Sequence, residues 1–172
     1  GDELTAFHLI IDYLRGKGIE DGVIVSTDLG FAKKARNYAA ALDAPMAIVE
    51  KRRLGNTMQS EALSLIGEVE GKTAIVVDEE ILTGGSIRNA VQVVREHGAR
   101  DVYVCCTHAA FTDKAVERLQ DLDLREIIVT NTLPLPADRR MPNMTILSIA
   151  PLIGEVIRRV HDGLSVGAIF NE

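Results

Sequence analysis

Short runs of β-branched residues alternate along the chain with longer stretches that have helical spacing. Six of the short runs predict strands, over residues 22–26, 45–49, 73–77, 101–106, 126–130 and 145–149. Most of them are apolar at consecutive positions rather than at every second position, which is typical of parallel strands covered on both faces.

Helical stretches separate these strands, over residues 31–42, 85–97, 113–119 and 152–161, and a further helical pattern starts close to the first residue. Gly98 follows the second stretch, at a place where helices commonly end on glycine. Strand, helix and strand in series predict a right-handed parallel α/β sheet. Ligand sites in such sheets lie beyond the carboxyl ends of the strands.

Composition narrows the class of protein. The 172 residues suit one domain over 1–172, and 47% hydrophobic with 26% charged residues is ordinary globular composition. A net charge of -6 disfavours a nucleic-acid partner. No apolar run approaches the roughly 20 residues of a membrane helix, so we expect no membrane partner and a cytoplasmic chain.

Two further features concern the chain ends and the cysteines. The sequence starts at Gly1 without a methionine, so we expect it to be a piece of a longer protein. Cys105 and Cys106 are adjacent in a predicted strand, and neighbouring strand residues point to opposite faces. They are therefore predicted to be buried free thiols of a reducing compartment, not a disulfide.

The richest candidate site follows the third predicted strand. The strand leads into Asp78, Glu79 and Glu80, and then into a turn made of Thr83, Gly84, Gly85 and Ser86 before a helix. Glycines let the backbone turn tightly, and the N–H groups at a helix start favour anions, so the turn predicts a phosphate cradle. The acids suit sugar hydroxyls or a hard divalent cation, and a phosphorylated sugar would satisfy both halves. The alternative is a plain helix start capped by Ser86.

Two other strand ends carry charged groups. Asp28 comes just after the first strand, where it could cap the following helix or hold a metal ion. Lys51, Arg52 and Arg53 are predicted to leave the second strand and enter a Gly/Asn-containing loop. Such a run is either a solvated face or a clamp that neutralises the charge of a polyphosphate.

These residues resemble the C-terminal half of ribose-phosphate pyrophosphokinase (phosphoribosyl pyrophosphate synthetase). Further similar segments lie in order along nearly the whole chain, at residues 102–108, 115–118, 129–132, 147–152 and 165–170. The resemblance implies the type I phosphoribosyltransferase fold, a parallel sheet with helices on both faces. It also implies transfer of diphosphate from MgATP to the 1-hydroxyl of ribose 5-phosphate, with Mg²⁺ as cofactor and ATP bound mainly by an N-terminal half that is absent here.

By the same resemblance each candidate acquires a role. Asp78 and Glu79 would hold the ribose hydroxyls, and the turn from Thr83 through Gly84 and Gly85 to Ser86 would hold the 5-phosphate. Lys51 and Arg53 would be the catalytic cations, and Asp28 would be the metal-associated aspartate. The family forms hexamers built from dimers, so a homo-oligomer is expected, with a dimer as the expected state of a fragment.

Three positions depart from the family pattern. Leu82 replaces an aspartate of the sugar loop, Phe31 replaces the second glycine of the aspartate turn, and Gly167 replaces a common serine of the tail. Leu82 and Phe31 favour an alternative, a sugar-phosphate-binding homologue without catalysis. A second alternative is a stand-alone phosphoribosyltransferase, which would share the same phosphate cradle.

Overall fold

The computed structural model describes residues 4–53 and 61–170. The strands are β1 Gly22–Ser26, β2 Met46–Arg53, β3 Glu61–Ile66, β4 Thr73–Ile81, β5 Asp101–Ala109, β6 Glu126–Thr130 and β7 Met144–Leu147. The α-helices are α1 Phe7–Lys17, α2 Ala32–Ala41, α3 Gly85–Glu96, α4 Asp113–Gln120 and α5 Ala150–His161, with 3-10 turns η1 Ala137–Arg139 and η2 Gly167–Ile169.

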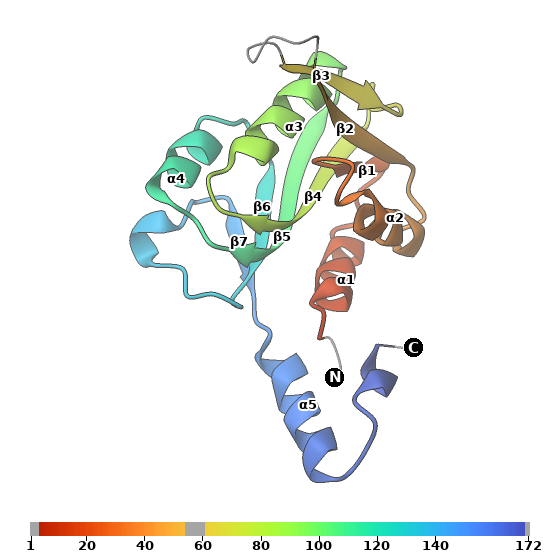
Figure 1. Ribbon diagram of the computed structural model, residues 1–172, viewed down its shortest axis with the longest axis vertical. Helices are drawn as coiled ribbons and strands as arrows, with labels where there is room; N and C mark the ends of the chain where they lie inside the picture. Colours follow the sequence, from red (N-terminus) through yellow and green to blue (C-terminus); the bar gives the residue numbers. More distant parts are fainter. Residues whose placement is uncertain (1–3, 54–60, 171–172) are drawn as a thin grey trace.

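The strands form one seven-stranded sheet in the order β3-β2-β1-β4-β5-β6-β7. All neighbouring strands are parallel except β2 and β3, which are antiparallel. Helices α3 and α4 cover one face of the sheet, and α1 and α2 cover the other (Figure 1). The predicted α/β sheet with helices on both faces is therefore confirmed.

Each face of the sheet has its own core. On the α3/α4 side, Ile87, Ala90, Val91 and Val94 of α3 pack on the strands at the spacing that places them on one helix face. On the α1/α2 side, Ile10, Ile11 and Leu14 of α1 do the same. We call these two clusters the α3/α4 core and the α1/α2 core. Cys106 belongs to the first and Cys105 to the second, both as buried free thiols, as predicted.

The structure corrects several predicted boundaries. Helix α1 begins at Phe7, later than the predicted helical pattern, whose first residues lie outside the described part of the chain. Strand β3 was not predicted, because its residues lack the β-branched run that marks the other strands. Strands β4 and β5 continue to Ile81 and Ala109, several residues beyond their predicted ends.

Helix α5 lies below the sheet in Figure 1, and the chain turns back after it toward η2. No residue of α5 is fully buried, and Ile157 and Val160 are 64% and 65% exposed. Over the described residues, every helix is too short or too polar to cross a lipid bilayer.

Candidate functional site

The register of the sheet brings the candidate residues to one edge. Ser26 of β1 lies beside Ile48 of β2 and Val77 of β4. Because these strands are parallel, the residues that follow this row meet at the same carboxyl edge. They include Asp28 after β1, Lys51 near the end of β2, and Asp78 in β4.

The turn between β4 and α3 is the segment predicted to be a phosphate cradle. Gly84 is the N-cap with φ 70°, a left-handed backbone that favours glycine. A Cβ atom on Gly84 would lie 3.4 Å from the Cα atom of Ala115, so the missing side chain also allows α4 to approach the turn. The first intrahelical bond runs from the N–H of Arg88 to the carbonyl of Gly84 at 2.9 Å. The preceding N–H groups are thus the ones that a helix start leaves available to an anion.

The N-cap of α3 is Gly84 and not Ser86, which the plain helix start would require. The Ser86 side chain makes no capping hydrogen bond, because Gly84 occupies the N-cap position and Ser86 lies inside the first turn. Thr83 and Ser86 are both exposed, so their hydroxyl groups remain accessible at the turn. The plain helix start capped by Ser86 was therefore wrong.

Asp78 is a partly buried carboxyl of this edge with two hydrogen-bond partners. Its Oδ2 accepts a hydrogen bond from the Thr27 hydroxyl at 2.9 Å, and its Oδ1 accepts one from the N–H of Glu79 at 2.8 Å. Burial raises the pKa of Asp78, and repulsion from Asp28 and Glu79 raises it further, whereas the two hydrogen bonds lower it. A cation or a hydroxyl donor beside this carboxyl would relieve that penalty.

Glu79 has a partner from the opposite side of the site. Lys34 of α2 forms an ion pair with its Oε1, and both side chains are about half exposed at 51% and 53%. Glu79 therefore faces α2, while Asp78 turns toward Thr27 at the end of β1. The two acids assigned to the ribose hydroxyls thus have different surroundings, and Glu80 next to them is exposed.

Asp28 takes part in a local turn. Its Oδ1 accepts a hydrogen bond from the N–H of Phe31 at 2.9 Å, just before α2 begins at Ala32. The Ser26 hydroxyl donates to the carbonyl of Asp28 at 2.7 Å and fixes the same turn. The carboxylate is therefore used to shape the start of α2, although its charge still acts on Asp78.

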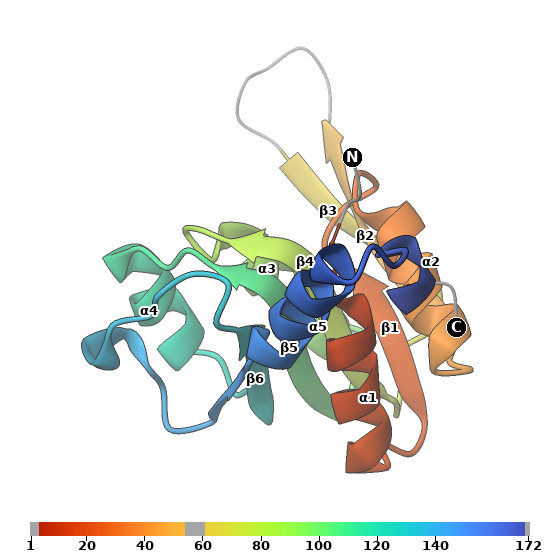
Figure 2. The same ribbon diagram turned by 90° about the horizontal axis from the view of Figure 1, so that it is seen from below.

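The basic residues lie in a strand, not in a loop as predicted. Strand β2 runs through Lys51 to Arg53, and Lys51 lies opposite Leu63 of β3 in an antiparallel pair. The expected Gly/Asn loop and the Arg53 side chain lie outside the described part of the chain. The β2–β3 hairpin projects from the body of the molecule (Figure 2). Among the described contacts, none joins Lys51 to the β4–α3 turn.

The acids of this edge suit a loosely held magnesium ion rather than a closed cage. Within residues 4–53 and 61–170, no three ligating side chains converge as a metal site. Mg²⁺ in phosphate-transfer sites usually keeps several waters and binds one or two carboxylates together with substrate phosphates. Asp28 and Asp78, close enough to repel each other, fit such a role.

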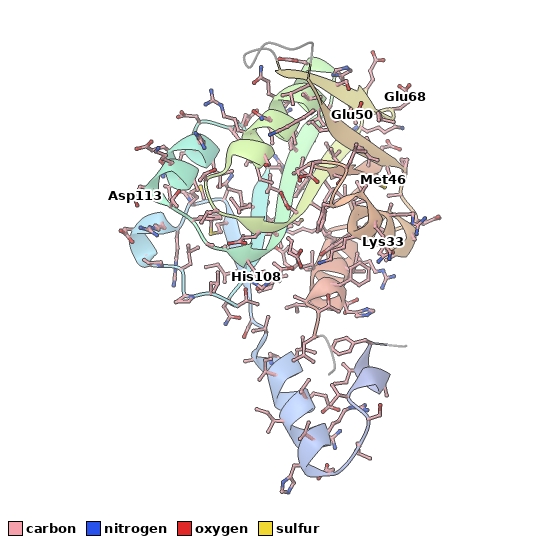
Figure 3. All side chains as sticks on the ribbon, viewed as in Figure 1. Lys33, Met46, Glu50, Glu68, His108 and Asp113 are labelled. Carbon is pink, nitrogen blue, oxygen red and sulfur yellow. The ribbon has the colours of Figure 1, made fainter. Side chains whose placement is uncertain are left out.

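A cavity of about 360 Å³ adjoins the acids on the α2 side. Glu79 and Lys34 line it together with Phe31, whose ring packs against the α1/α2 core. His108 lines it too, at the lower end of β5 in Figure 3, and its Nδ1 lies 2.9 Å from the Thr132 hydroxyl oxygen. Phe31, which replaces the second glycine of the family's aspartate turn, thus forms part of the wall of this cavity. The His108 ring is held by its hydrogen bond with Thr132.

Sequence reasoning missed three residues of the site. Thr27, Lys34 and Arg118 contact Asp78, Glu79 and the carbonyl of Thr83, respectively. Thr27 and Lys34 stand close to Asp28 in the sequence, so their nearness to a strand end was a usable signal. Arg118 lies in the segment 115–118 that resembles the family, but nothing in the sequence linked it to the turn, because it reaches the turn from a helix more than thirty residues further along the chain.

Comparison with known proteins places this chain among enzymes of one family. Residues 55–171 match the family model of the phosphoribosyl synthetase-associated domain. The chain is 46% identical over 170 residues to a ribose-phosphate pyrophosphokinase of Synechocystis, covering 98% of this chain and 51% of that protein. It is 51% identical to the chloroplastic ribose-phosphate pyrophosphokinase 2 of Arabidopsis thaliana, covering 98% of this chain and 43% of that protein.

Solved structures agree with the sequence comparison. Phosphoribosylpyrophosphate synthetase from Mycobacterium smegmatis superposes with a TM-score of 0.87 at 40% identity, over 94% of this chain and 52% of that one. A purine phosphoribosyltransferase from Pyrococcus horikoshii, at 14% identity and a TM-score of 0.52, shares the fold alone. The chain spans about half the length of the relatives it matches. With its sheet, its β4–α3 turn and these relatives, the chain belongs to the ribose-phosphate pyrophosphokinase family.

Proposed function

We propose that the chain is the ribose-5-phosphate-binding part of a ribose-phosphate diphosphokinase. The enzyme would transfer diphosphate from MgATP to the 1-hydroxyl of ribose 5-phosphate and release AMP. The oxygen of that hydroxyl would attack the β-phosphorus of ATP, and the bond from this phosphorus to the oxygen of AMP would break. ATP-binding residues would come from a part of the enzyme that this chain does not include. This agrees with the chain spanning about half the length of its relatives.

The observation that carries the proposal is that the β4–α3 turn, which suits an anion, directly follows the strand that holds Asp78 and Glu79. The turn from Thr83 to Ser86 offers N–H donors at the start of α3 and the hydroxyl groups of two exposed residues, Thr83 and Ser86. Asp78, in the strand that enters this turn, has a raised pKa that hydrogen bonds from substrate hydroxyls would lower. A sugar phosphate, with an anion at one end and hydroxyls at the other, matches both halves of the site.

Each residue then has a proposed part in binding or transfer. The turn with Thr83, Gly84, Gly85 and Ser86 would bind the 5-phosphate, and Asp78 and Glu79 would orient the ribose hydroxyls. Asp28 is proposed beside Mg²⁺, which neutralises phosphate charge when it is bound with ATP. Lys51 and Arg53, carried on the β2–β3 hairpin, would stabilise the charge of the transferring group.

Partners and assembly follow from the same proposal. The substrates would be ribose 5-phosphate and ATP, with neither nucleic acid nor membrane involved. A homo-oligomer is proposed, a hexamer for the complete enzyme and a dimer for this chain alone, acting in the cytoplasm.

One specific observation keeps a second candidate function open. Leu82, at the position where the family has an aspartate, is 53% exposed at the end of β4. An apolar side chain there offers the sugar no hydrogen bond, which favours a homologue that binds the sugar phosphate without catalysing transfer.

Two measurements separate these functions. Titration calorimetry of this chain with ribose 5-phosphate tests the site, and release of AMP from ATP by the complete enzyme tests the reaction. AMP release that requires both ribose 5-phosphate and Mg²⁺ supports the diphosphokinase. Binding without AMP release supports the non-catalytic homologue, and absence of ribose-5-phosphate binding by this chain contradicts both.

A further inference from the structure

Helix α4 lies against the β4–α3 turn and is attached to it at three points. The N–H and the hydroxyl of Thr112 both donate to the carbonyl of Leu82, each at 3.0 Å. Ala115 packs where a side chain on Gly84 would stand. Nη1 of Arg118 donates to the carbonyl of Thr83 at 2.8 Å. The turn assigned to the phosphate is therefore shaped by a helix that contributes no residue to the family's loop motif.

The attachment of α4 is itself braced. Arg139, in η1, donates from Nη1 to the carbonyl of Phe111 at 2.5 Å and pairs from Nη2 with Asp113 at 2.9 Å. Asp113 marks the start of α4 on the left flank of the molecule in Figure 3. Because both ends of the segment 111–118 are fixed, the position of Arg118 at the turn does not depend on a single contact.

The guanidinium of Arg118 lies at the mouth of the cradle. Its Nη1 is 3.5 Å from the place where a Cβ atom on Gly85 would stand, next to the first N–H groups of α3. The carbonyl oxygen of Thr83, so close to the turn, would repel a bound anion. The hydrogen bond from Arg118 to this oxygen offsets that repulsion. Guanidinium carries five N–H donors, and in the described part of the chain the Thr83 carbonyl is the sole acceptor for this one. No carboxylate among those residues neutralises it.

We propose that Arg118 is a positioning residue for the 5-phosphate. It holds the Thr83 carbonyl so that the N–H groups of the turn remain directed to the phosphate. It also adds a positive charge at the start of α3, where the helix already favours anions. This inference rests on the proposed function of the turn, and it extends that site to a helix beyond the loop motif.

The test compares variants of this chain by titration calorimetry with ribose 5-phosphate and, separately, with inorganic phosphate. Arg118→Gln is expected to raise the Kd for both ligands about tenfold, the size of a lost charged hydrogen bond. Arg118→Lys keeps the charge without the planar fork, so a smaller loss is expected. Arg125→Gln removes the same charge from an exposed side chain at the opposite edge of the sheet and should leave both Kd values unchanged.

The outcomes are distinct. Equal Kd values for Arg118→Gln and the wild type overturn the inference while leaving the proposed function intact. Equal losses in Arg118→Gln and Arg118→Lys, together with an equal fall in Tm, overturn it in favour of a role in folding alone. A wild-type chain that does not bind ribose 5-phosphate overturns the proposed function and this inference together. If Arg118→Gln does not fold, Arg118→Met, which keeps the aliphatic stem, takes its place under the same criteria.

A kinetic readout in the complete enzyme completes the test. Loss of a phosphate-positioning group should raise KM for ribose 5-phosphate about tenfold and change kcat little, since the chemistry occurs at the other end of the sugar. A fall in kcat with an unchanged KM would contradict the assignment.

Discussion

Asp78, which we propose to orient the ribose hydroxyls, carries a cost to folding stability. Burial raises its pKa, so the folded state holds a proton on this carboxyl more tightly than the unfolded chain does. Folding stability therefore falls as the pH rises from the unfolded pKa through the folded one, and the full cost is present above both values. The hydrogen bonds from Thr27 and Glu79 offset part of that cost without removing it.

Asp78→Asn is accordingly expected to stabilise the fold at pH 7. The gain in the free energy of unfolding should be on the order of 0.5–1 kcal/mol, measured by urea unfolding, and should shrink as the pH is lowered toward 4. Asp138→Asn, at an exposed carboxyl in η1, serves as the control and should change little. A less stable Asp78→Asn at pH 7 would mean that the carboxylate's hydrogen bonds outweigh its desolvation.

Leu82 gives a second prediction at this scale. Leu82→Asp would place a carboxylate at the exposed end of β4, where the family has one, and should accept a hydrogen bond from a sugar hydroxyl. Calorimetry with ribose 5-phosphate is expected to show about fivefold tighter binding, near the value of one added hydrogen bond. Leu82→Asn places a side chain with the shape of aspartate but without its charge, so its gain in affinity for ribose 5-phosphate should be smaller. Unchanged binding in both variants would show that the site does not use this position.

At the scale of elements, the β2–β3 hairpin holds Lys51 on a projecting strand, apart from the β4–α3 turn. Lys51 stands on a projecting strand beyond the end of β1, and its side chain is exposed. In the complete enzyme, Lys51→Ala is expected to lower kcat about a hundredfold, as loss of a group that stabilises transferred charge does. KM for ribose 5-phosphate should change by less than about twofold, because no contact between Lys51 and the turn is found among residues 4–53 and 61–170.

The matched control is Lys72→Ala, which removes a lysine at the opposite edge of the sheet, just before β4. Steady-state kinetics of both variants decide the matter. Equal activity of Lys51→Ala and Lys72→Ala would assign the basic residues of β2 to a solvated surface.

Helix α1 is fixed to β6 and β7 by a small polar network away from the site. The hydroxyl of Tyr13 donates to Glu126 at 2.6 Å, and Lys17 pairs with the same carboxylate at 2.8 Å. Burial alone would raise the pKa of Glu126, but the hydrogen bonds from Lys17, Thr145 and Tyr13 outweigh it and lower the pKa. The stability that this carboxylate contributes is thus present above its unfolded pKa and lost as the pH falls through the folded one.

Tyr13→Phe removes one arm of this network and should lower the free energy of unfolding by about 1 kcal/mol at pH 7. The loss should diminish in acid, where Glu126 is protonated, and ribose-5-phosphate binding should be unaffected. Tyr103→Phe, in β5, is the control, because no partner of its hydroxyl is found among the described residues. Urea unfolding of both variants at pH 7 and at a pH well below 4, where the lowered pKa of Glu126 is approached, checks this. Equal stabilities of the two variants at pH 7 would show that the network contributes nothing to the free energy of unfolding.

The elements also show where sequence reasoning succeeds and where it stops. The parallel strands were predicted because short, continuous runs of β-branched residues are typical of strands that are buried on both faces. Strand β3 was missed because its stability comes from pairing with β2, which no local pattern in Glu61–Ile66 reveals. The acids of β4 were expected after the strand, yet the strand continues through them, because pairing with β5 extends to Ile81. Likewise Arg118 reaches the turn through tertiary packing alone.

At the scale of the whole molecule, one sheet separates the α3/α4 core from the α1/α2 core. Cys105 and Cys106 lie on opposite sides of it, and burial raises the pKa of both thiols. Neither thiol should react with a thiol reagent such as dithionitrobenzoate until the chain unfolds. In the single-cysteine variants Cys105→Ala and Cys106→Ala, the remaining thiol is expected to react at the rate of global unfolding, followed by stopped-flow absorbance.

Equal rates in the two variants would mean that both cores open in one cooperative step. A faster reaction of Cys105 would instead reveal that α1 and α2 detach while the α3/α4 side remains folded.

The placement of these cysteines has a practical consequence. The two sulfur atoms belong to consecutive residues, so a probe on one or the other is at almost the same point along the chain and at the same strand of the sheet. What differs is only the side of the sheet that the probe senses. Carbon-13 chemical shifts of the two unmodified cysteines would therefore report on the two cores separately. A ligand bound on the α3/α4 side should shift the Cys106 resonance more than that of Cys105, which serves as the reference within the same molecule.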